Sequence, residues 1–206
     1  MLALAALCNN AVLEGKPGKF SASGEPTENA LVTAAAMQGK LKPSLERSCP
    51  RVKELPFDST RKRMTTIHRL NGGYLVITKG APDILLPMCS RVLVAGQERE
   101  MSAAYRTQIL KRNEEMAGDA LRVMGVAYRQ ASSEPGDPER ELVFCGLLGM
   151  LDPPRKEVWR AVATCKTAGI KPVMITGDHA ITASAIAREI GITKAVSYTH
   201  LRAHET

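Results

Sequence analysis

The fold is read most directly from residues 64–78, MTTIHRLNGGYLVIT. Two strand-like runs, Met64–Leu70 and Tyr74–Thr78, flank Asn71-Gly72-Gly73. Asn-Gly between such runs is the strongest short-range signal for a β-hairpin, because both residues accept a positive φ angle. The stretch therefore predicts a pair of antiparallel strands.

The segments around this hairpin extend it into a mixed domain. Ala95-Gly96-Gln97 predicts a second hairpin, and Pro26-Thr27 suits the start of a helix. The further strands that we expect are Val52–Phe57, Arg91–Val94, Glu98–Met101, Arg122–Arg129 and Glu141–Leu148. The expected helices are Glu28–Gln38, Ala81–Met88 and Ala103–Gly118. Residues 1–150 are thus predicted to form an α/β domain with a largely antiparallel sheet and flanking helices.

The pattern changes after Asp152-Pro153-Pro154-Arg155. Each proline fixes its own φ and restricts the residue before it, so these four residues predict a stiff hinge. A helix, a strand, a turn and a second helix are then expected at Lys156–Ala168, Ile170–Ile175, Thr176-Gly177-Asp178 and Ile181–Ile190. This alternation predicts part of a parallel, Rossmann-like sheet over residues 151–194, whose other strands we expect outside this chain. Residues 195–206 do not continue the pattern and are expected to be a non-native tail.

The composition excludes several classes of protein. Of 206 residues, 44% are hydrophobic and 24% are charged, which is ordinary for a chain that buries a core and excludes wholesale disorder. No apolar run approaches the ~18 residues that a membrane-spanning helix needs. The five cysteines form no Cys-x-x-Cys, which favours reduced thiols in a reducing compartment over disulfides or a zinc site.

The excess of positive charge is local. The net charge is +7, and nine basic but only three acidic residues stand between Lys40 and Leu70. Such a cluster indicates an anionic partner, namely a nucleotide phosphate, a nucleic acid or an acidic membrane surface. A solvated basic face is the alternative that the sequence leaves open.

Two turns that contain glycine have residue types that suit a ligand site. Thr176-Gly177-Asp178 lies between a strand and a helix, where open α/β sheets bind ligands, and its hydroxyl and carboxylate suit a phosphoryl group with a metal. Helix capping by Asp178 is the simpler alternative. Lys79-Gly80-Ala81-Pro82 ends a strand and opens a helix; it would admit a ligand beside the glycine, but an ordinary turn with an exposed lysine has the same pattern.

Phe57 stands shortly before three consecutive cations, residues 61–63. An aromatic face can stack on a base while cations meet phosphates, although a lone aromatic residue more often belongs to the core. Glu28 is well placed to stabilise the dipole of its helix, and Arg122 has the pattern of a cation at a strand edge. Each of these signals is weak when it is taken singly.

Six short blocks occur in a specific order: GEPTENAL (24–31), FDSTRKRMT (57–65), KGAPD (79–83), LR (121–122), MLDPPR (150–155) and MITGDH (174–179). In this order they resemble the nucleotide-binding domain and the adjoining phosphorylation-domain segment of P-type cation-transporting ATPases. The likeness is strongest to the calcium-pump-like branch and its bacterial members, and it covers about residues 1–194. It implies an α+β nucleotide-binding domain followed by part of a haloacid-dehalogenase-type domain.

The resemblance implies a nucleotide site in the first domain, made of Glu28, Phe57, Arg61, Lys62, Lys79, Gly80 and Arg122. Phe57 would stack on adenine, and Glu28 would hydrogen-bond the edge of the base. Lys62 and Lys79 would line the path to the phosphates, the glycine would let the backbone approach closely, and Arg122 would reach the phosphates.

The resemblance also implies a second group of residues on the phosphate side. Thr176, Gly177 and Asp178 would meet the γ-phosphate when the two domains close about a hinge at Asp152, Pro153, Pro154 and Arg155. Some animal calcium pumps carry an arginine two residues after the stacking phenylalanine, where this chain has Ser59. The phosphate contact made from that position is therefore left open.

The function so implied is ATP binding in the cytosolic portion of a pump. Such a pump couples ATP hydrolysis, through an aspartyl-phosphate and with Mg²⁺, to transport of a cation, and the branch suggests calcium. The family's Asp-Lys-Thr-Gly-Thr would lie upstream of Met1, and its Gly-Asp-Gly magnesium motif beyond Gly191. The chain itself is expected to be soluble and to bind nucleotide without hydrolysing it. Its expected partners are ATP and the rest of the same polypeptide, at the cytosolic face of a bacterial plasma membrane, and no nucleic acid.

Two other classes of protein are weighed against this reading. A soluble phosphatase or phosphotransferase of the haloacid-dehalogenase type would share the Thr-Gly-Asp environment but would leave residues 1–150 unexplained. A nucleic-acid-binding module would use the cluster at 40–69 and would show a steep salt dependence. That module usually interleaves aromatic residues with cations, and here only Phe57 is available.

Overall fold

The computed structural model describes residues 1–16, 19–70, 72–119, 121–151, 155–175 and 180–192. The chain divides into two compact units. The first holds residues 1–113 and 123–150, and the second holds the described residues of 114–122 and 151–206. The domain boundaries that the sequence suggests, 1–150 and 151–194, stay a prediction.

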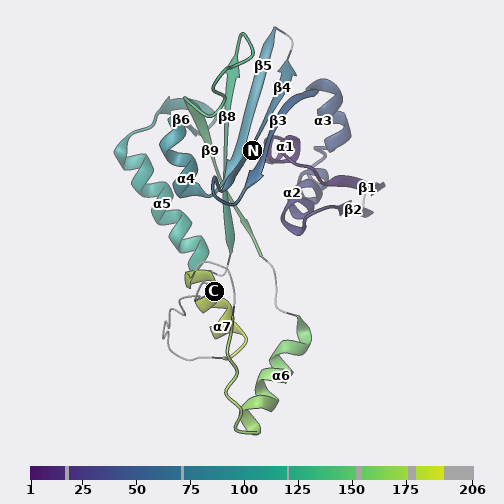
Figure 1. Ribbon diagram of the computed structural model, residues 1–206, viewed down its shortest axis with the longest axis vertical. Coiled ribbons are helices and arrows are strands. Elements are labelled where there is room, and N and C mark those ends of the chain that lie inside the picture. Colours follow the sequence, from purple (N-terminus) through teal and green to yellow (C-terminus); the bar gives the residue numbers. More distant parts are fainter. Residues whose placement is uncertain (17–18, 71, 120, 152–154, 176–179, 193–206) are drawn as a thin grey trace, which may run out of the picture. The chain divides into compact units, whose positions relative to one another are not determined.

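A seven-stranded sheet forms the centre of the first unit, in the order β3-β4-β5-β8-β9-β6-β7 (Figure 1). Its strands are β3 (Arg51–Asp58), β4 (Arg63–Leu70), β5 (Gly73–Gly80), β6 (Cys89–Val94), β7 (Gln97–Glu100), β8 (Arg122–Ala131) and β9 (Leu142–Met150). The pairs β3–β4, β4–β5, β5–β8 and β6–β7 are antiparallel, and β6 runs parallel to β9. The predicted α/β fold with a largely antiparallel sheet is confirmed.

The hairpin predicted from residues 64–78 is the most regular part of the sheet. Strands β4 and β5 pair without interruption from Arg63 opposite Gly80 to Leu70 opposite Gly73. Gly72 has a φ of +84°, a value that glycine adopts without strain. The turn therefore depends on the residue type on which the prediction rested.

Three helices cover one face of the sheet: α1 (Leu2–Leu7), α2 (Pro26–Met37) and α3 (Lys42–Ser48) (Figure 1). The core on this face comprises Ala5, Leu7, Cys8, Leu31, Cys49, Met64, Leu75, Ile77 and Val126. Helix α2 begins with Pro26 in its first turn, where the missing N–H of proline costs nothing, and Glu28 follows in the same turn. The proline thus fixes where the helix starts and places Glu28 at its amino end.

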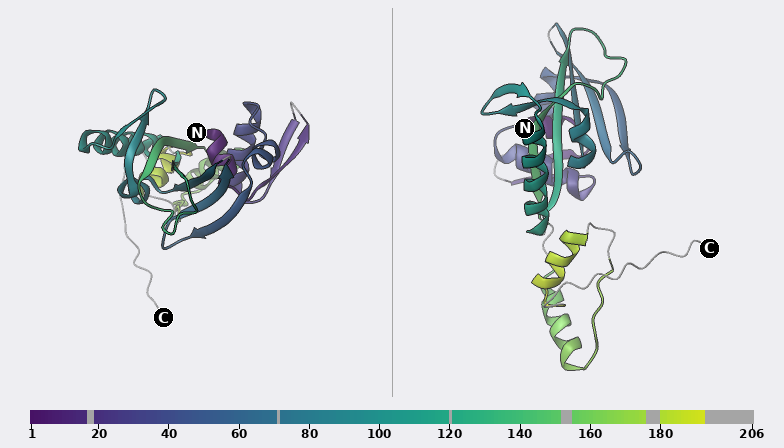
Figure 2. Two further views of the ribbon diagram at one scale, coloured as in Figure 1. Left: turned by 90° about the horizontal axis from the view of Figure 1, so that it is seen from above. Right: turned by 90° about the vertical axis from the view of Figure 1, so that its left-hand side faces the viewer.

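The opposite face is covered by α4 (Pro82–Leu85), the short 3₁₀ helix η1 (Leu86–Met88) and α5 (Ala103–Gly118). Their core comprises Ile67, Val76, Leu85, Leu86, Cys89, Val92, Ala127, Leu142 and Phe144, with Tyr105 and Ile109 of α5 packed against it. The expected helix Ala81–Met88 is thus divided into an α-helical turn and a 3₁₀ turn. The second view of Figure 2 shows α5 running along this face.

Four elements at the amino-terminal end were not predicted. They are α1, α3 and the antiparallel strands β1 (Val12–Lys16) and β2 (Lys19–Ser23), which pair with each other beside α2 (Figure 2). Helix α1 is a run of Leu and Ala whose sequence carries no polar face to reveal a period of 3.6. Strand β1 is mostly exposed, so it lacks the alternation of apolar and polar residues that marks a half-buried strand.

The second unit contains α6 (Lys156–Thr167) and α7 (Ala180–Glu189). Gly169 follows Ala168, the C-cap residue of α6, and has a φ of +72°, the left-handed conformation in which glycine commonly ends a helix. The prediction of a strand at Ile170–Ile175 was wrong. These residues have no regular secondary structure, and the side chains of Val173 and Ile175 are 72% and 87% exposed. A parallel strand exists only with hydrogen-bonded neighbours, and no strand in the described part of the chain pairs with this segment.

Candidate functional site

Most of the site residues predicted in the first unit lie at one end of the sheet. Strand β3 ends at Asp58 and β4 begins at Arg63, while β5 runs back antiparallel to β4 and ends at Gly80. Phe57 and the turn at 59–62 therefore lie at the same end as Lys79 and Gly80. The topology thus brings together residues that are more than twenty positions apart in the sequence.

Lys79 and Glu28 form an ion pair at this end. Lys79 Nζ lies 2.6 Å from Glu28 Oε1, and the two side chains are 5% and 16% exposed. The other carboxylate oxygen of Glu28 accepts a hydrogen bond from the backbone N–H of Asn10 at 3.1 Å, and its main-chain carbonyl accepts one from Asn9 Nδ2 at 3.0 Å. An ammonium removed from water in this way is stable only because a carboxylate compensates its charge.

Phe57 is the exposed aromatic residue of this region. Its side chain is 64% exposed, whereas a core phenylalanine such as Phe144 is 1% exposed. A β-bulge interrupts β3 after Leu55, so that Phe57 and its preceding residue both lie opposite the single residue Met64. Met64 in turn pairs with Lys79. Neighbouring strands lie about 4.8 Å apart, so the main chain at Phe57 lies about 10 Å from the main chain at Lys79, measured across the strands.

A tight turn carries Arg61 and Lys62 between β3 and β4. Asp58 Oδ1 accepts hydrogen bonds from the backbone N–H groups of Thr60 and Arg61 at 2.9 and 2.8 Å. These bonds hold the pKa of Asp58 below its ordinary value, and the bond from Arg61 has the larger effect. Lys62 has a φ of +51°, and its exposed side chain has no partner among the described residues. The turn therefore presents Lys62 to solvent on a fixed backbone.

Gly80 lets two backbone segments approach each other. A Cβ atom at this position would lie 2.6 Å from the carbonyl oxygen of Lys62 and 2.6 Å from Arg63 Cβ. The Lys62 carbonyl accepts the N–H of Ala81 at 3.1 Å. Close approach was the predicted role of this glycine, with a ligand as the neighbour, but the segment beside it in the structure is the start of β4.

Arg61 forms an ion pair with a carboxylate that was not predicted from the sequence. Its guanidinium forms an ion pair with Glu139, which also pairs with Arg63 at 2.6 Å and accepts a hydrogen bond from Thr65 Oγ1 at 2.6 Å. Glu139 lies 78 residues from Arg61, in the loop between β8 and β9. No local sequence signal links residues so far apart.

The remaining predicted site residues are placed less fully. Arg122 is the first residue of β8 and falls in the second unit. Arg155 is the N-cap residue of α6. The others lie outside the described residues: Asp152, Pro153, Pro154, Thr176, Gly177 and Asp178.

Several cations of the basic cluster at 40–70 serve the fold. Lys42 Nζ donates to the carbonyl of Ala11 at 2.7 Å, and burial lowers the pKa of this lysine. Arg51 donates to the carbonyls of Leu7 and Asn9 and pairs with Glu54 at 2.8 Å. These side chains hold loops in place, so they do not form the solvated basic face that a nucleic acid would need.

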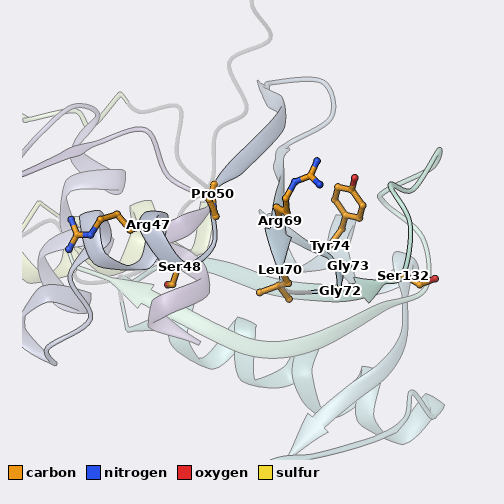
Figure 3. Close-up of a pocket in the computed structure, with 9 residues that line it drawn as sticks. All are labelled: Arg47, Ser48, Pro50, Arg69, Leu70, Gly72, Gly73, Tyr74 and Ser132. Atoms are coloured by element: carbon orange, nitrogen blue, oxygen red, sulfur yellow. The ribbon is translucent and has the colours of Figure 1, made fainter.

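A shallow groove lies at the opposite end of the β4–β5 hairpin (Figure 3). Arg69 and Tyr74 stand side by side in it, with the guanidinium 5.3 Å from the ring centre. None of the predicted site residues lines this groove. It is therefore a separate feature of the surface.

Three further findings concern metals, membranes and the cysteines. Over the residues that the structure describes, no three His, Cys, Asp or Glu side chains gather closely enough to hold a metal ion. No helix in the same part of the chain is both long enough and apolar enough to cross a bilayer. All five cysteines are free thiols.

Comparison with known proteins identifies the family. A family described as the cytoplasmic domain N of P-type ATPases matches residues 1–157, which is well over half of the chain. The chain belongs to the P-type ATPases. The sheet with helices on both faces and the ion pair between Lys79 and Glu28 are therefore features of a P-type ATPase N domain.

Individual relatives agree with this family. The chain is 44% identical over 191 residues to calcium-transporting ATPase 1 of Bacillus cereus and 42% identical over 195 residues to the calcium-transporting ATPase of Bacillus subtilis. It is also 38% identical over 216 aligned positions to the sodium/potassium-transporting ATPase subunit alpha-2 of Gallus gallus. These matches cover 91–92% of this P-type ATPase chain but only 21–22% of each relative. The chain thus spans about a fifth of the length of these relatives.

Proposed function

We propose that this N domain binds ATP, with the adenine ring stacked on Phe57 and the polar edge of the base hydrogen-bonded to Glu28. The observation that carries the proposal is an exposed phenylalanine at the same end of the sheet as a buried lysine–glutamate pair. Base stacking on an aromatic ring contributes about 1–3 kcal/mol in nucleic-acid complexes, where bases stack in the same way.

The phosphate side of the site is assigned to cations at this end of the sheet. Lys62 is exposed on a fixed turn and can donate to phosphate oxygens without first breaking an ion pair. Lys79 compensates Glu28, so its ammonium can be shared between that carboxylate and an arriving nucleotide. We further assign Arg122, and Thr176, Gly177 and Asp178, to the phosphates, with residues 152–155 as the hinge between the two domains.

A titration with a fluorescent ATP analogue tests the site. We expect the chain to bind ATP with a dissociation constant between tens of micromolar and millimolar, roughly 4–6 kcal/mol. Phe57→Ala should weaken binding by about 1–3 kcal/mol, and Lys79→Ala should weaken it as well. Unchanged affinity in both variants would remove the assignment. Competition by short duplex DNA at physiological salt would favour the nucleic-acid reading instead.

For the longer protein that contains this chain we propose cation transport driven by ATP hydrolysis. The names of the relatives support an ATPase, and the aspartyl-phosphate, the Mg²⁺ and the location at the cytosolic face of a bacterial plasma membrane are inferred from the same family. When Mg²⁺ is bound it supplies charge neutralisation at the phosphates. The chain alone is proposed to bind nucleotide without hydrolysing it.

Calcium is the cation that we propose. Some relatives are named as calcium-transporting and others as sodium/potassium-transporting, so the family itself does not settle the ion. Calcium uptake driven by ATP into inverted membrane vesicles that carry the longer protein is the direct test. Uptake of sodium or potassium without calcium uptake would overturn this part of the proposal and would leave ATP binding by the N domain intact.

A further inference from the structure

The carboxylate of Glu139 is the centre of a polar cluster on the β4–β5 hairpin. Its side chain is 11% exposed. Oε2 accepts a hydrogen bond from Arg63 Nε at 2.8 Å and forms an ion pair with Arg63 Nη2 at 2.6 Å, while Oε1 accepts hydrogen bonds from Arg61 and from Thr65 Oγ1. Thr65 Oγ1 also lies 3.1 Å from Thr78 Oγ1, so the cluster extends onto β5. Both oxygens of the carboxylate are therefore fully used by neighbouring side chains.

The surroundings of Glu139 favour the charged form of its carboxylate. Burial raises the pKa of Glu139, but the hydrogen bonds from Arg63 and Thr65 and the nearby guanidinium groups outweigh burial and leave the pKa below its ordinary value. Thr65 and Thr78 are fully buried, so the partners have little freedom to move. A buried carboxylate with charged donors is costly to break, because the remaining cations are left without compensation.

The two arginines that Glu139 holds are the immediate neighbours of Lys62. The backbone of Lys62 is fixed from both sides as well, since its N–H donates to the Asp58 carbonyl at 2.6 Å and its carbonyl accepts from Ala81. Of the three consecutive cations, the flanking two are 31% and 17% exposed and paired, and only the middle one has an exposed side chain without a described partner. Glu139 thus determines which cation of this turn faces solvent.

We propose that Glu139 is a positioning residue for nucleotide binding. By holding the two flanking arginines it fixes the β3–β4 turn, so that Lys62 supplies the phosphate contact from this turn and Arg61 does not. This inference rests on the proposed ATP site. It assigns a role in binding to a residue that lies outside the set predicted to touch the nucleotide.

A double-mutant cycle on the 206-residue chain tests the proposal. Glu139→Gln keeps the shape of the side chain and removes its charge, and Lys62→Gln removes the ammonium while keeping most of the stem. We expect Glu139→Gln to raise the dissociation constant for ATP roughly fivefold in the wild-type background, within the coupling range of residues in one network. In the Lys62→Gln background the same change should have less than about a twofold effect, which is the tolerance for independent sites.

The matched control is Glu141→Gln. Glu141 lies in the same loop, but its side chain is 80% exposed and its carboxylate is 3.9 Å from Arg129, so ATP affinity should not change. If Glu139→Gln does not fold, Thr65→Val removes one bond to the carboxylate at nearly constant shape. It should give a smaller loss of affinity that again disappears in the Lys62→Gln background.

The outcomes separate this inference from the proposed function. A wild-type chain that binds no ATP overturns both. If the wild type binds but Glu139→Gln has no effect, or weakens binding by the same factor in both backgrounds, the positioning role is overturned while the ATP site stands. A purely structural role of Glu139 would give that second result, because a loss of folded protein does not depend on Lys62.

Discussion

Lys79 at the end of β5 and Glu28 in the first turn of α2 are joined by an ion pair of 2.6 Å, although 51 residues separate them in the sequence. The pair lies beside the core formed by Leu31 and Ile77. The pair connects the amino end of α2 to the end of β5, in the region where we propose that nucleotide binds. If the proposed site is correct, the same two side chains contribute to both stability and nucleotide binding, and the two effects have to be separated by experiment.

Glu28→Gln should destabilise the domain markedly. The change leaves the ammonium of Lys79 buried without a counter-charge, and we expect a loss of about 3 kcal/mol, the lower end of the range for breaking a buried pair. The midpoint of urea unfolding at pH 7 measures it. In the double variant Glu28→Gln/Lys79→Met the unpaired charge is gone, so part of the stability should return; a double variant as unstable as the sum of the two single changes contradicts this account.

Phe57→Ala should cost almost no stability. Because the ring is 64% exposed, the free energy of unfolding should change by no more than about 0.5 kcal/mol, as for other surface substitutions. Phe144→Ala is the matched comparison: that ring is 1% exposed and its removal should cost about 3–5 kcal/mol. If both variants lose similar stability in urea, the ring of Phe57 is a packing residue and the proposed stacking role loses its basis.

Gly80→Ala should destabilise the junction between β4 and β5. The added methyl group would overlap the carbonyl of Lys62 and the side chain of Arg63, and overpacking of this kind costs about 1–3 kcal/mol. Gly118→Ala serves as the control, because a Cβ there meets nothing within 4 Å. In thermal melts, the midpoint should be lowered for Gly80→Ala but not for Gly118→Ala. Equal midpoints would mean that β4 shifts to make room without a loss of stability.

Stability should fall on mild acidification because of His68. Burial is the main cause that lowers the pKa of this fully buried imidazole from its ordinary value of 6.5, and it outweighs the hydrogen bond between Nδ1 and the Cys49 carbonyl, which raises the pKa. The unfolded chain therefore takes up the proton first as the pH falls. The stabilisation is fully present above pH 6.5 and declines below it, by up to about 1.4 kcal/mol per pH unit.

Urea midpoints between pH 8 and pH 5 measure this decline. Among the charged groups near His68, Arg51 lowers its pKa further and Glu46 raises it, but burial dominates. His68→Gln should be less stable than the wild type at pH 8 and should show a flatter profile. An equally steep profile in the variant would place the titrating group elsewhere.

Local chemistry accounts for what the sequence predicted well. The hairpin at 64–78 was predicted because Asn-Gly stands between two strand-like runs, and the two strands pair as expected, with Gly72 at a positive φ. Helix α2 was predicted because Pro26 is a start signal that depends on its neighbours alone. In both cases the information needed for the structure lies within a few residues.

Elements that depend on distant partners were predicted less well. Residues 170–175 have the composition of a strand, but a strand needs hydrogen-bonded neighbours and the described residues supply none. The site divides in the same way. The residue types of Phe57 and Lys79 suggested roles in binding, whereas the pairing of Arg61 with Glu139 joins positions 78 residues apart and leaves no local trace.

The order of the strands bears on how the protein is made. Strands β3, β4 and β5 lie toward one edge of the sheet, and β6 and β7 lie toward the other edge. Strands β8 and β9 lie between these two groups, although they are the last strands to be synthesised. The two early parts therefore have open edges until residues 122–150 have been synthesised. Exposed edges of this kind invite pairing with other chains. A nascent chain that stalls before residue 142 should thus be a client of chaperones, whereas one released after residue 150 can close its sheet unaided.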